Sequence, residues 1–223
     1  MPPLSPLDIT GIVTVLDVLG VCVFAISGAL VAARKEMDPI GFIALGTATG
    51  IGGGTLRDLV LGAQPVFWVS DSLYLIAPVV VSLAMFWLAR LFHSRYAGLV
   101  WADALGMALF SVTGASKALT LGAPPSVAIA MGIMTAAFGG IIRDVLAGES
   151  PLVLHKEIYV TAAFAGAGTL VVLHGLGVGQ EVRALAAFAL AFTVRALAIA
   201  RGWSLPHYRR PDRPLDGPPR RRD

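Results

Sequence analysis

Two short motifs in this 223-residue chain place an arginine and an aspartate a few positions after a run of glycines: GGGTLRD at residues 52–58 and FGGIIRD at residues 138–144. Both motifs lie in long apolar stretches, where ionisable side chains are costly unless they are paired or hydrated. Glycines inside such a helix permit a kink, and the carbonyls released there are suitable ligands for a monovalent cation. The candidate site residues are therefore Gly52, Gly53, Gly54, Arg57, Asp58, Phe138, Gly139, Gly140, Arg143 and Asp144.

The same residues also permit a structural interpretation. Glycines allow two helices to pack closely, and the charged residues could hold helix segments together or extend toward the membrane interface. Because neighbouring residues on a helix point in different directions, we expect pairing between the motifs, with Arg57 near Asp144 and Arg143 near Asp58. Phe138, which stands where the first motif has a glycine, is expected to narrow a path at that level.

Five further polar residues are candidates for a charge network or a path lining. Asp17 and Asp103 lie near the starts of two apolar segments, where a carboxylate either caps the helix or attracts cations. Ser27 and Thr113 could line a wet path or bond back to a carbonyl of their own helix. Lys117 lies within an apolar segment, where it either gates a path and responds to voltage or extends to the lipid headgroups.

The composition indicates that membrane-spanning helices position these residues. The chain is 56% hydrophobic and only 14% charged, whereas soluble domains have about a quarter of charged residues. The glycines at 50–54 lack the Lys-Ser/Thr that follows in a phosphate-binding loop, and the four histidines lack the spacing of metal ligands. We therefore expect a protein that is not an enzyme and that uses no cofactor.

The apolar segments are long enough to cross a bilayer, which requires about 20 residues each. Turn-forming sequences such as Asp38-Pro39, Gln64-Pro65 and 123–125 separate them. The predicted fold is all-α, with seven spans at 12–33, 40–62, 69–91, 98–119, 126–147, 157–176 and 180–201. Residues 1–11 precede the first span, and residues 202–223 are rich in Pro and Arg, which predicts a disordered basic tail.

The chain also contains an internal repeat. Residues 17–65 align with residues 103–151 without gaps, at a constant offset of 86 and with 18 identities in 49 positions. The matched residues include both Arg-Asp pairs and the two glycines before each of them. Each copy covers three spans (12–91 and 98–176), and an odd number inverts the second copy in the membrane. The seventh span, 180–201, has no counterpart and is expected to pack outside the duplicated core.

Lysine and arginine bias predicts the orientation, because cytoplasmic loops carry an excess of these residues. Arg34, Lys35, Arg90, Arg95 and the basic tail fall on one side of the seven spans. The N-terminus is then extracytoplasmic and the C-terminus cytoplasmic.

The paired motifs, together with FAISGA at 24–29 and FSVTGASKA at 110–118, resemble the trimeric intracellular cation channel family, whose bacterial members are sometimes labelled glycine transporters. The resemblance covers residues 12–201. It implies a homotrimer in the bacterial inner membrane, in contact with lipids. Nucleic acid is not an expected partner, because the basic residues cluster in the tail and in short loops, a distribution that fits membrane topology better than a phosphate-binding face. It also implies one potassium-permeable pore in each protomer, lined by kinked second and fifth spans, and it assigns Lys117 as the lysine of the fourth span.

Three functions are open at this point. The first is passive conduction of potassium or another monovalent cation. The second is secondary transport of a small neutral solute such as glycine, by rocking of one repeat against the other. The third is a structural or assembly role without transport.

Overall fold

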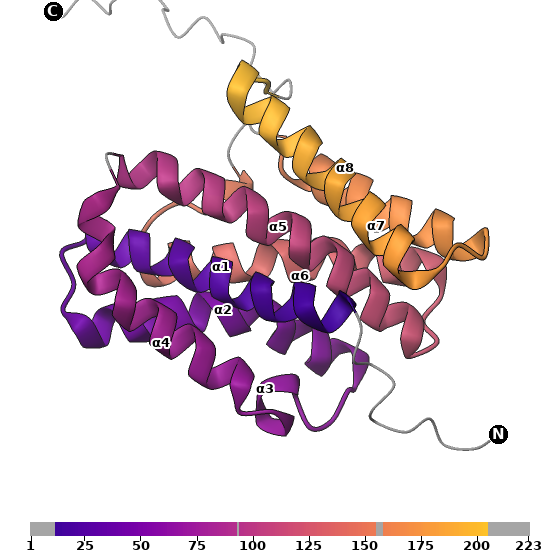
Figure 1. Ribbon diagram of the computed structural model, residues 1–223, viewed down its shortest axis with the longest axis horizontal. Helices are drawn as coiled ribbons and strands as arrows, with labels where there is room; N and C mark the ends of the chain where they lie inside the picture. The colour runs from indigo at the N-terminus through magenta and orange to yellow at the C-terminus, as the bar shows by residue number, and fades with distance from the viewer. Residues whose placement is uncertain (1–11, 93, 155–157, 205–223) are drawn as a thin grey trace, which may run out of the picture.

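The computed structural model describes residues 12–92, 94–154 and 158–204, and the predicted N-terminal segment and basic tail lie outside them except for residues 202–204. Every regular element in these residues is helical (Figure 1). The helices are α1 (Ile12–Arg34), α2 (Pro39–Leu61), α3 (Phe67–Ser70), α4 (Leu73–Leu88), α5 (Arg95–Thr120), α6 (Pro125–Leu146), α7 (Val160–Gly175) and α8 (Gln180–Arg201). Short 3₁₀ turns lie at Ala89–Leu91 and Leu152–Leu154.

Local sequence explains where the helices begin and end. Asp38 caps α2, because its Oδ1 accepts a hydrogen bond of 2.8 Å from the Gly41 backbone N–H and Pro39 supplies the first helical residue. The same helix ends at Gly62, which has φ 66°, a left-handed conformation that favours glycine. Ser94 caps α5 by accepting a bond of 3.2 Å from Ala97 N–H.

The third predicted span, 69–91, divides in two in the structure. The four-residue helix α3 precedes α4, and Asp71 separates them because its carboxylate accepts a hydrogen bond of 2.9 Å from Leu73 N–H. The separate short helix was not predicted. Its position matters for the site described below.

The protein is an all-helical membrane protein, and in the described part of the chain five helices are long and apolar enough to cross a bilayer: α1, α4 with its 3₁₀ extension, α5, α6 and α8. The predicted spans 40–62 and 157–176 correspond to α2 and α7, which fall outside this group. Helix α7 has only 16 residues. Helix α2 carries six glycines together with Arg57 and Asp58, and it packs against α1, α4 and α6, so that much of it faces protein.

Helices α1 and α5 pack against each other at the centre of the molecule, where the rings of Phe24 and Phe110 lie 5.1 Å apart. Helix α4 covers α1 and α2, whereas α7 and α8 lie side by side against α5 (Figure 1). The buried side of α8 carries Ala184, Ala187, Ala191 and Ala198, which allow close packing. The unrepeated helix is therefore attached to the second half of the chain.

Candidate functional site

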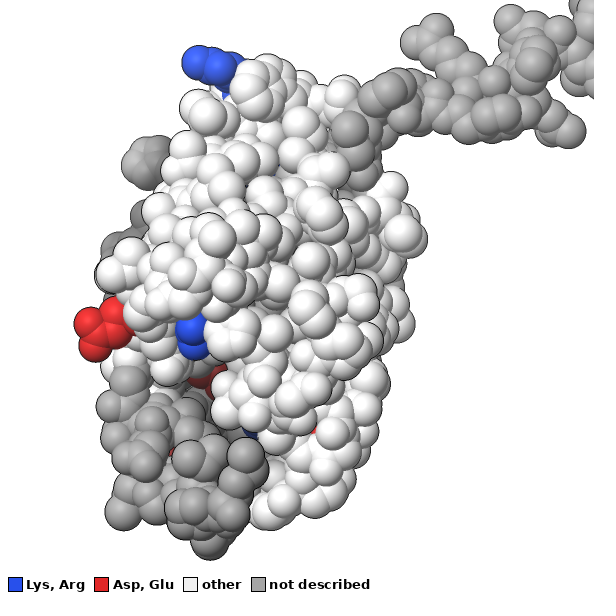
Figure 2. All heavy atoms as spheres, turned by 90° about the vertical axis from the view of Figure 1, so that its right-hand side faces the viewer, with Lys and Arg blue, Asp and Glu red and all other residues white. Residues whose placement is uncertain are grey.

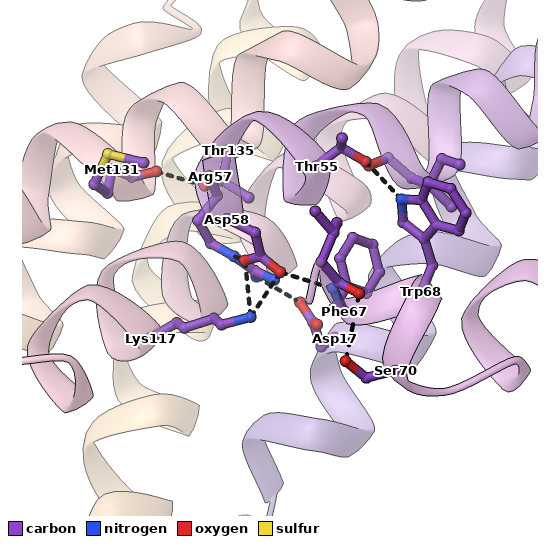
Figure 3. Close-up of polar contacts among 12 residues, drawn as sticks. Asp17, Thr55, Arg57, Asp58, Phe67, Trp68, Ser70, Lys117, Met131 and Thr135 are labelled. Atoms are coloured by element: carbon purple, nitrogen blue, oxygen red, sulfur yellow. Dashed lines mark hydrogen bonds and ion pairs between the residues drawn. The ribbon is translucent and has the colours of Figure 1, made fainter. Parts of the chain in front are cut away.

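The first charge cluster consists of Asp17, Arg57, Asp58 and Lys117, which come from α1, α2 and α5. Arg57 donates from Nε to Asp58 at 2.8 Å and from Nη1 to Asp17 at 3.2 Å. Lys117 Nζ lies 2.8 Å from the Asp58 carboxylate (Figure 3). Arg57 and Asp58 are buried, and the Lys117 side chain is 31% exposed. Each buried charge thus meets an opposite one, as a low-dielectric interior requires.

The second charge cluster consists of Asp103, Arg143 and Asp144, from α5 and α6. Arg143 donates from Nε to Asp144 at 2.7 Å and from Nη1 to Asp103 at 2.6 Å, and its Nη1 also donates to Ser27 of α1. All three charged residues are at most 2% exposed. The two arginine–aspartate contacts of this cluster reproduce those of the first cluster at the positions that the repeat matches.

These contacts correct the predicted pairing. Arg57 does not pair with Asp144, nor Arg143 with Asp58: each arginine binds the aspartate beside it and a second aspartate 40 residues earlier in its own repeat. The prediction failed because an arginine side chain is long enough to turn along its helix and bring Nε to the next residue. Asp17 and Asp103 are also not helix caps, since neither lies in the first turn of its helix.

The aspartate of each motif also holds the segment that follows its helix. Asp58 Oδ2 accepts a hydrogen bond of 2.9 Å from Phe67 N–H, at the start of α3. Asp144 Oδ2 accepts a bond of 2.8 Å from Leu152 N–H, at the start of the 3₁₀ turn. Trp68 Nε1 donates to Thr55 Oγ1 at 3.0 Å and adds a second attachment in the first repeat (Figure 3). The motifs therefore hold the segments that follow α2 and α6 as well as the charges.

The two clusters differ in the space around them. The first borders a cavity of about 200 Å³, lined by residues that include Asp17, Arg57, Thr113 and Lys117. Thr113 Oγ1 has no hydrogen-bond partner among the described residues. Figure 2 shows the side of the molecule that lies on the right in Figure 1. It has a hollow in which acidic and basic side chains lie beneath a mostly uncharged surface. The space around the second cluster, in contrast, is too narrow to admit a water molecule.

The glycines of the motifs bring α2 and α6 into contact. A Cβ added to Gly53 would collide with the Thr135 carbonyl oxygen, and one added to Gly139 would lie 2.7 Å from the Thr49 carbonyl oxygen. Both helices keep an unbroken helical pattern through their glycines. The predicted helix break with released carbonyls is therefore not observed, because the absent side chains serve a helix crossing instead.

The remaining motif residues lie around this crossing. A Cβ at Gly52 would meet Ile142, one at Gly54 would meet the ring of Phe67, and one at Gly140 would lie 3.2 Å from Asp103 Oδ1. Gly140 thus borders the second cluster. Phe138 is half-buried on α6, and its predicted narrowing of a path stays a prediction.

Two buried residues near the second charge cluster, Arg195 and Tyr159, were not predicted. Arg195 lies on α8 and is 1% exposed, and its guanidinium lies 5.2 Å from the centre of the Tyr159 ring. Tyr159 lines the narrow space at the second cluster. An arginine in the middle of an apolar span was the available signal, since such residues are functional candidates by default.

Comparison with known proteins places the chain in a family. The family model described as "Glycine transporter" matches residues 14–90 and 100–175, one stretch in each half of the chain. The UPF0126 membrane protein of Vibrio cholerae is 39% identical over 200 residues, which cover 89% of this chain and 84% of that protein. The UPF0126 inner membrane protein YadS of Escherichia coli K12 is 45% identical over 152 residues, covering 68% and 73%.

Among solved structures, the trimeric intracellular cation channel orthologue from Rhodobacter sphaeroides is 52% identical, with a TM-score of 0.84 over 86% of this chain and 99% of that one. A second structure, described as a basis for conductance through these cation channels, is 33% identical with a TM-score of 0.81, over 91% of this chain and 100% of that one. The chain therefore belongs to the trimeric intracellular cation channel family, among its bacterial members.

Proposed function

We propose that the protein is a passive potassium channel of the bacterial inner membrane. In this proposal it is a homotrimer in which each protomer holds its own pore, between the two repeats and along α2 and α6. The seven main helices cross the membrane as two inverted three-helix units followed by α8, with the N-terminus outside. The similarity to solved cation channels supports conduction of cations, and the Rhodobacter sphaeroides relative, a trimeric intracellular cation channel orthologue, supports the trimer.

The observation that carries the proposal is the cavity at the first charge cluster. Its lining reaches from Val13 and Gln180, at the starts of α1 and α8, to the buried Asp17 and Arg57. Charged groups at membrane depth that border open space are typical of ion pathways. The first charge cluster is electrically balanced, with two carboxylates and two cationic groups, and three of its members (Asp17, Arg57 and Lys117) line the cavity. A small change in these charges therefore alters the affinity of the cavity for a cation.

The same geometry supports a gating role for Lys117. Lys117 lines the cavity, and its ammonium group donates a hydrogen bond of 2.8 Å to the buried Asp58 carboxylate. Movement of this side chain away from Asp58 would expose a carboxylate to a permeating cation. A charge that moves through part of the membrane field also gives voltage dependence, which amounts to a fraction of the roughly 2.3 kcal/mol for one charge that crosses the whole field at 100 mV.

The alternative is secondary transport of a small neutral solute such as glycine, and the description of the matching family model favours it. The two functions differ in what moves and how. A channel carries a current that depends on the ion gradient, whereas a transporter takes up its solute with saturation.

Flux through reconstituted vesicles tests the proposal. Purified protein in potassium-loaded liposomes should release potassium rapidly once an ionophore balances the charge, and it should not accumulate radiolabelled glycine. The Gly53→Leu variant should lose potassium flux because the side chain enters the α2–α6 crossing, whereas Gly168→Leu, at a position with open space around it, is the matched control. Saturable glycine uptake without potassium flux would reject the channel in favour of the transporter.

A further inference from the structure

Helices α1 and α5 carry part of the lining of the cavity at matched places. Two residues of α1 lie three and four positions before Asp17, and two residues of α5 lie three and four positions after Thr113. Residues at this spacing share a helix face, so all four lie one turn from Asp17 and Thr113, toward the start of α1 and the end of α5. They are Val13, Thr14, Ser116 and Lys117, all of which line the cavity.

The repeat gives the second half of the chain the same arrangement with different residues. Asp103 and Ser27, the counterparts of Asp17 and Thr113, both accept hydrogen bonds from Arg143 Nη1. One turn beyond them, toward the end of α1 and the start of α5, the offset of 86 residues leads to four apolar side chains: Leu30, Val31, Leu99 and Val100. Three of these stand where the lining of the cavity is polar.

These four apolar residues, named here the apolar plug, are tightly packed. Each is at most 7% exposed, and Leu30, Val31 and Leu99 belong to one apolar cluster with residues of α2 and α4. A Cβ added to Gly98 of α5 would lie 3.3 Å from Leu30 Cδ1 of α1, so the two helices approach closely here. The space at the neighbouring second charge cluster admits no water. The half of the site opposite the cavity is therefore closed.

Polar contacts hold the helix ends beyond the apolar plug. Arg95 Nη1 donates to the Ala33 carbonyl at 3.3 Å and joins the start of α5 to the end of α1. Glu149, just after α6, pairs with Arg34 at 3.1 Å and with Lys35 at 3.2 Å. Such partly exposed pairs are weak. The closure therefore depends mainly on the apolar residues.

We propose that the apolar plug is a hydrophobic gate in the conduction path, at the end of the bundle that the basic residues predict to be cytoplasmic. A narrow apolar constriction excludes water and therefore ions. The gate opens when the end of α1 separates from the start of α5. Water that then enters gives a partner to Arg143 Nη2, which has none among the described residues. This inference rests on the proposed channel function.

Single-channel recording of Val31→Thr tests the gate, at a voltage where the wild type is seldom open. Threonine has nearly the shape of valine, and its hydroxyl is costly in a dry plug but not in a hydrated one. The open probability should rise by roughly threefold or more, with the current through an open channel unchanged. The matched control is Val112→Thr, because Val112 of α5 is also fully buried but packs in a different apolar cluster. No rise for Val31→Thr, or an equal rise for the control, would overturn the inference.

Thiol reactivity gives a second measurement that needs no current and no folded Val31→Thr variant. Val31→Cys and Lys117→Cys place a thiol at matched positions of the repeat, and Cys22→Ser removes the native thiol. A small water-soluble methanethiosulfonate reagent, without applied voltage, should modify Lys117→Cys at least about tenfold faster, because thiol reactivity follows exposure. Equal rates would show that the plug is not sealed.

The two proposals fail in different ways. A wild-type protein that carries no potassium current would reject the channel function and the gate together. A conducting wild type whose Val31→Thr variant behaves like Val112→Thr, and whose Val31→Cys variant reacts like Lys117→Cys, would reject the gate alone.

Discussion

The crossing of α2 and α6 gives a quantitative prediction for Gly53→Ala. The added methyl group would collide with the carbonyl oxygen of Thr135 and lie 3.3 Å from its carbonyl carbon. Both are backbone atoms of α6, so the collision is relieved only when the helices separate. Overpacking of this kind costs about 1–3 kcal/mol, and the better helix propensity of alanine returns at most about 1 kcal/mol. We therefore expect Gly53→Ala to lower the free energy of unfolding by about 1–2 kcal/mol.

Gly168→Ala is the matched control. Gly168 lies inside α7, and no atom lies within 4 Å of a Cβ added there. Only the higher helix propensity of alanine then acts, and it stabilises the protein by about 0.5–1 kcal/mol. The two variants should therefore differ by roughly 2 kcal/mol, which corresponds to a difference of about 4–8 °C in melting temperature for a chain of this size.

Thermal unfolding of the purified variants in one detergent, at one heating rate, measures this difference. Gly139→Ala should behave like Gly53→Ala, because its Cβ would lie 2.7 Å from the Thr49 carbonyl oxygen. If Gly53→Ala melts at or above the temperature of Gly168→Ala, the glycines do not serve the crossing and the close approach of the two helices is wrong.

Three further predictions concern the charged residues. Arg143→Gln leaves two buried carboxylates without their ion-pair partner, so it should destabilise by about 3–5 kcal/mol and give little folded protein in size-exclusion chromatography; normal yield and melting temperature would contradict this. Lys117→Met should lower the free energy of unfolding by only about 1 kcal/mol, because the lysine is 31% exposed and Asp58 keeps its bonds from Arg57 and Phe67. The variant should nevertheless flatten the voltage dependence of the open probability. An unchanged slope in bilayer recordings would exclude Lys117 as the moving charge. Glu149→Gln removes half-exposed ion pairs of 3.1 and 3.2 Å to Arg34 and Lys35. The free energy of unfolding should fall by no more than about 1 kcal/mol, and the resulting decrease in melting temperature should become smaller in 0.5 M salt. A larger decrease that salt does not reduce would show that these ion pairs behave as buried ones.

Much of the helical fold could be predicted because long apolar segments and turn-forming sequences leave few alternatives. Asp38-Pro39 and Gly62 bound α2 close to the predicted positions. The short helix α3 could not be predicted, because its position depends on the bond from Phe67 N–H to the distant Asp58. Four residues carry no periodicity from which a helix can be recognised.

The candidate site was predicted as a set of residues and not as a set of contacts. The repeat identified Asp17, Arg57 and their counterparts, yet the predicted pairing was wrong. Repeat symmetry allows pairs within each copy as well as between copies, and only the fold decides which carboxylate an arginine reaches. Similarly, the glycines pointed either to a break or to close packing, and the structure has an unbroken α2 in contact with α6.

Arg195 could not be predicted from the repeat. The repeat marks residues that occur twice, and Arg195 lies on the helix that has no counterpart. Its burial against Tyr159 depends on how α8 packs beside α7. A test of each ionisable residue inside an apolar segment, independent of the repeat, would have found it.

The most direct test of the proposed function is a recording from the purified wild-type protein in a planar bilayer under a tenfold gradient of potassium chloride. A cation channel should produce discrete openings whose current reverses near the potassium equilibrium potential, about 59 mV for a tenfold gradient. Absence of discrete openings, or reversal at the opposite sign as chloride selectivity requires, would contradict the proposal.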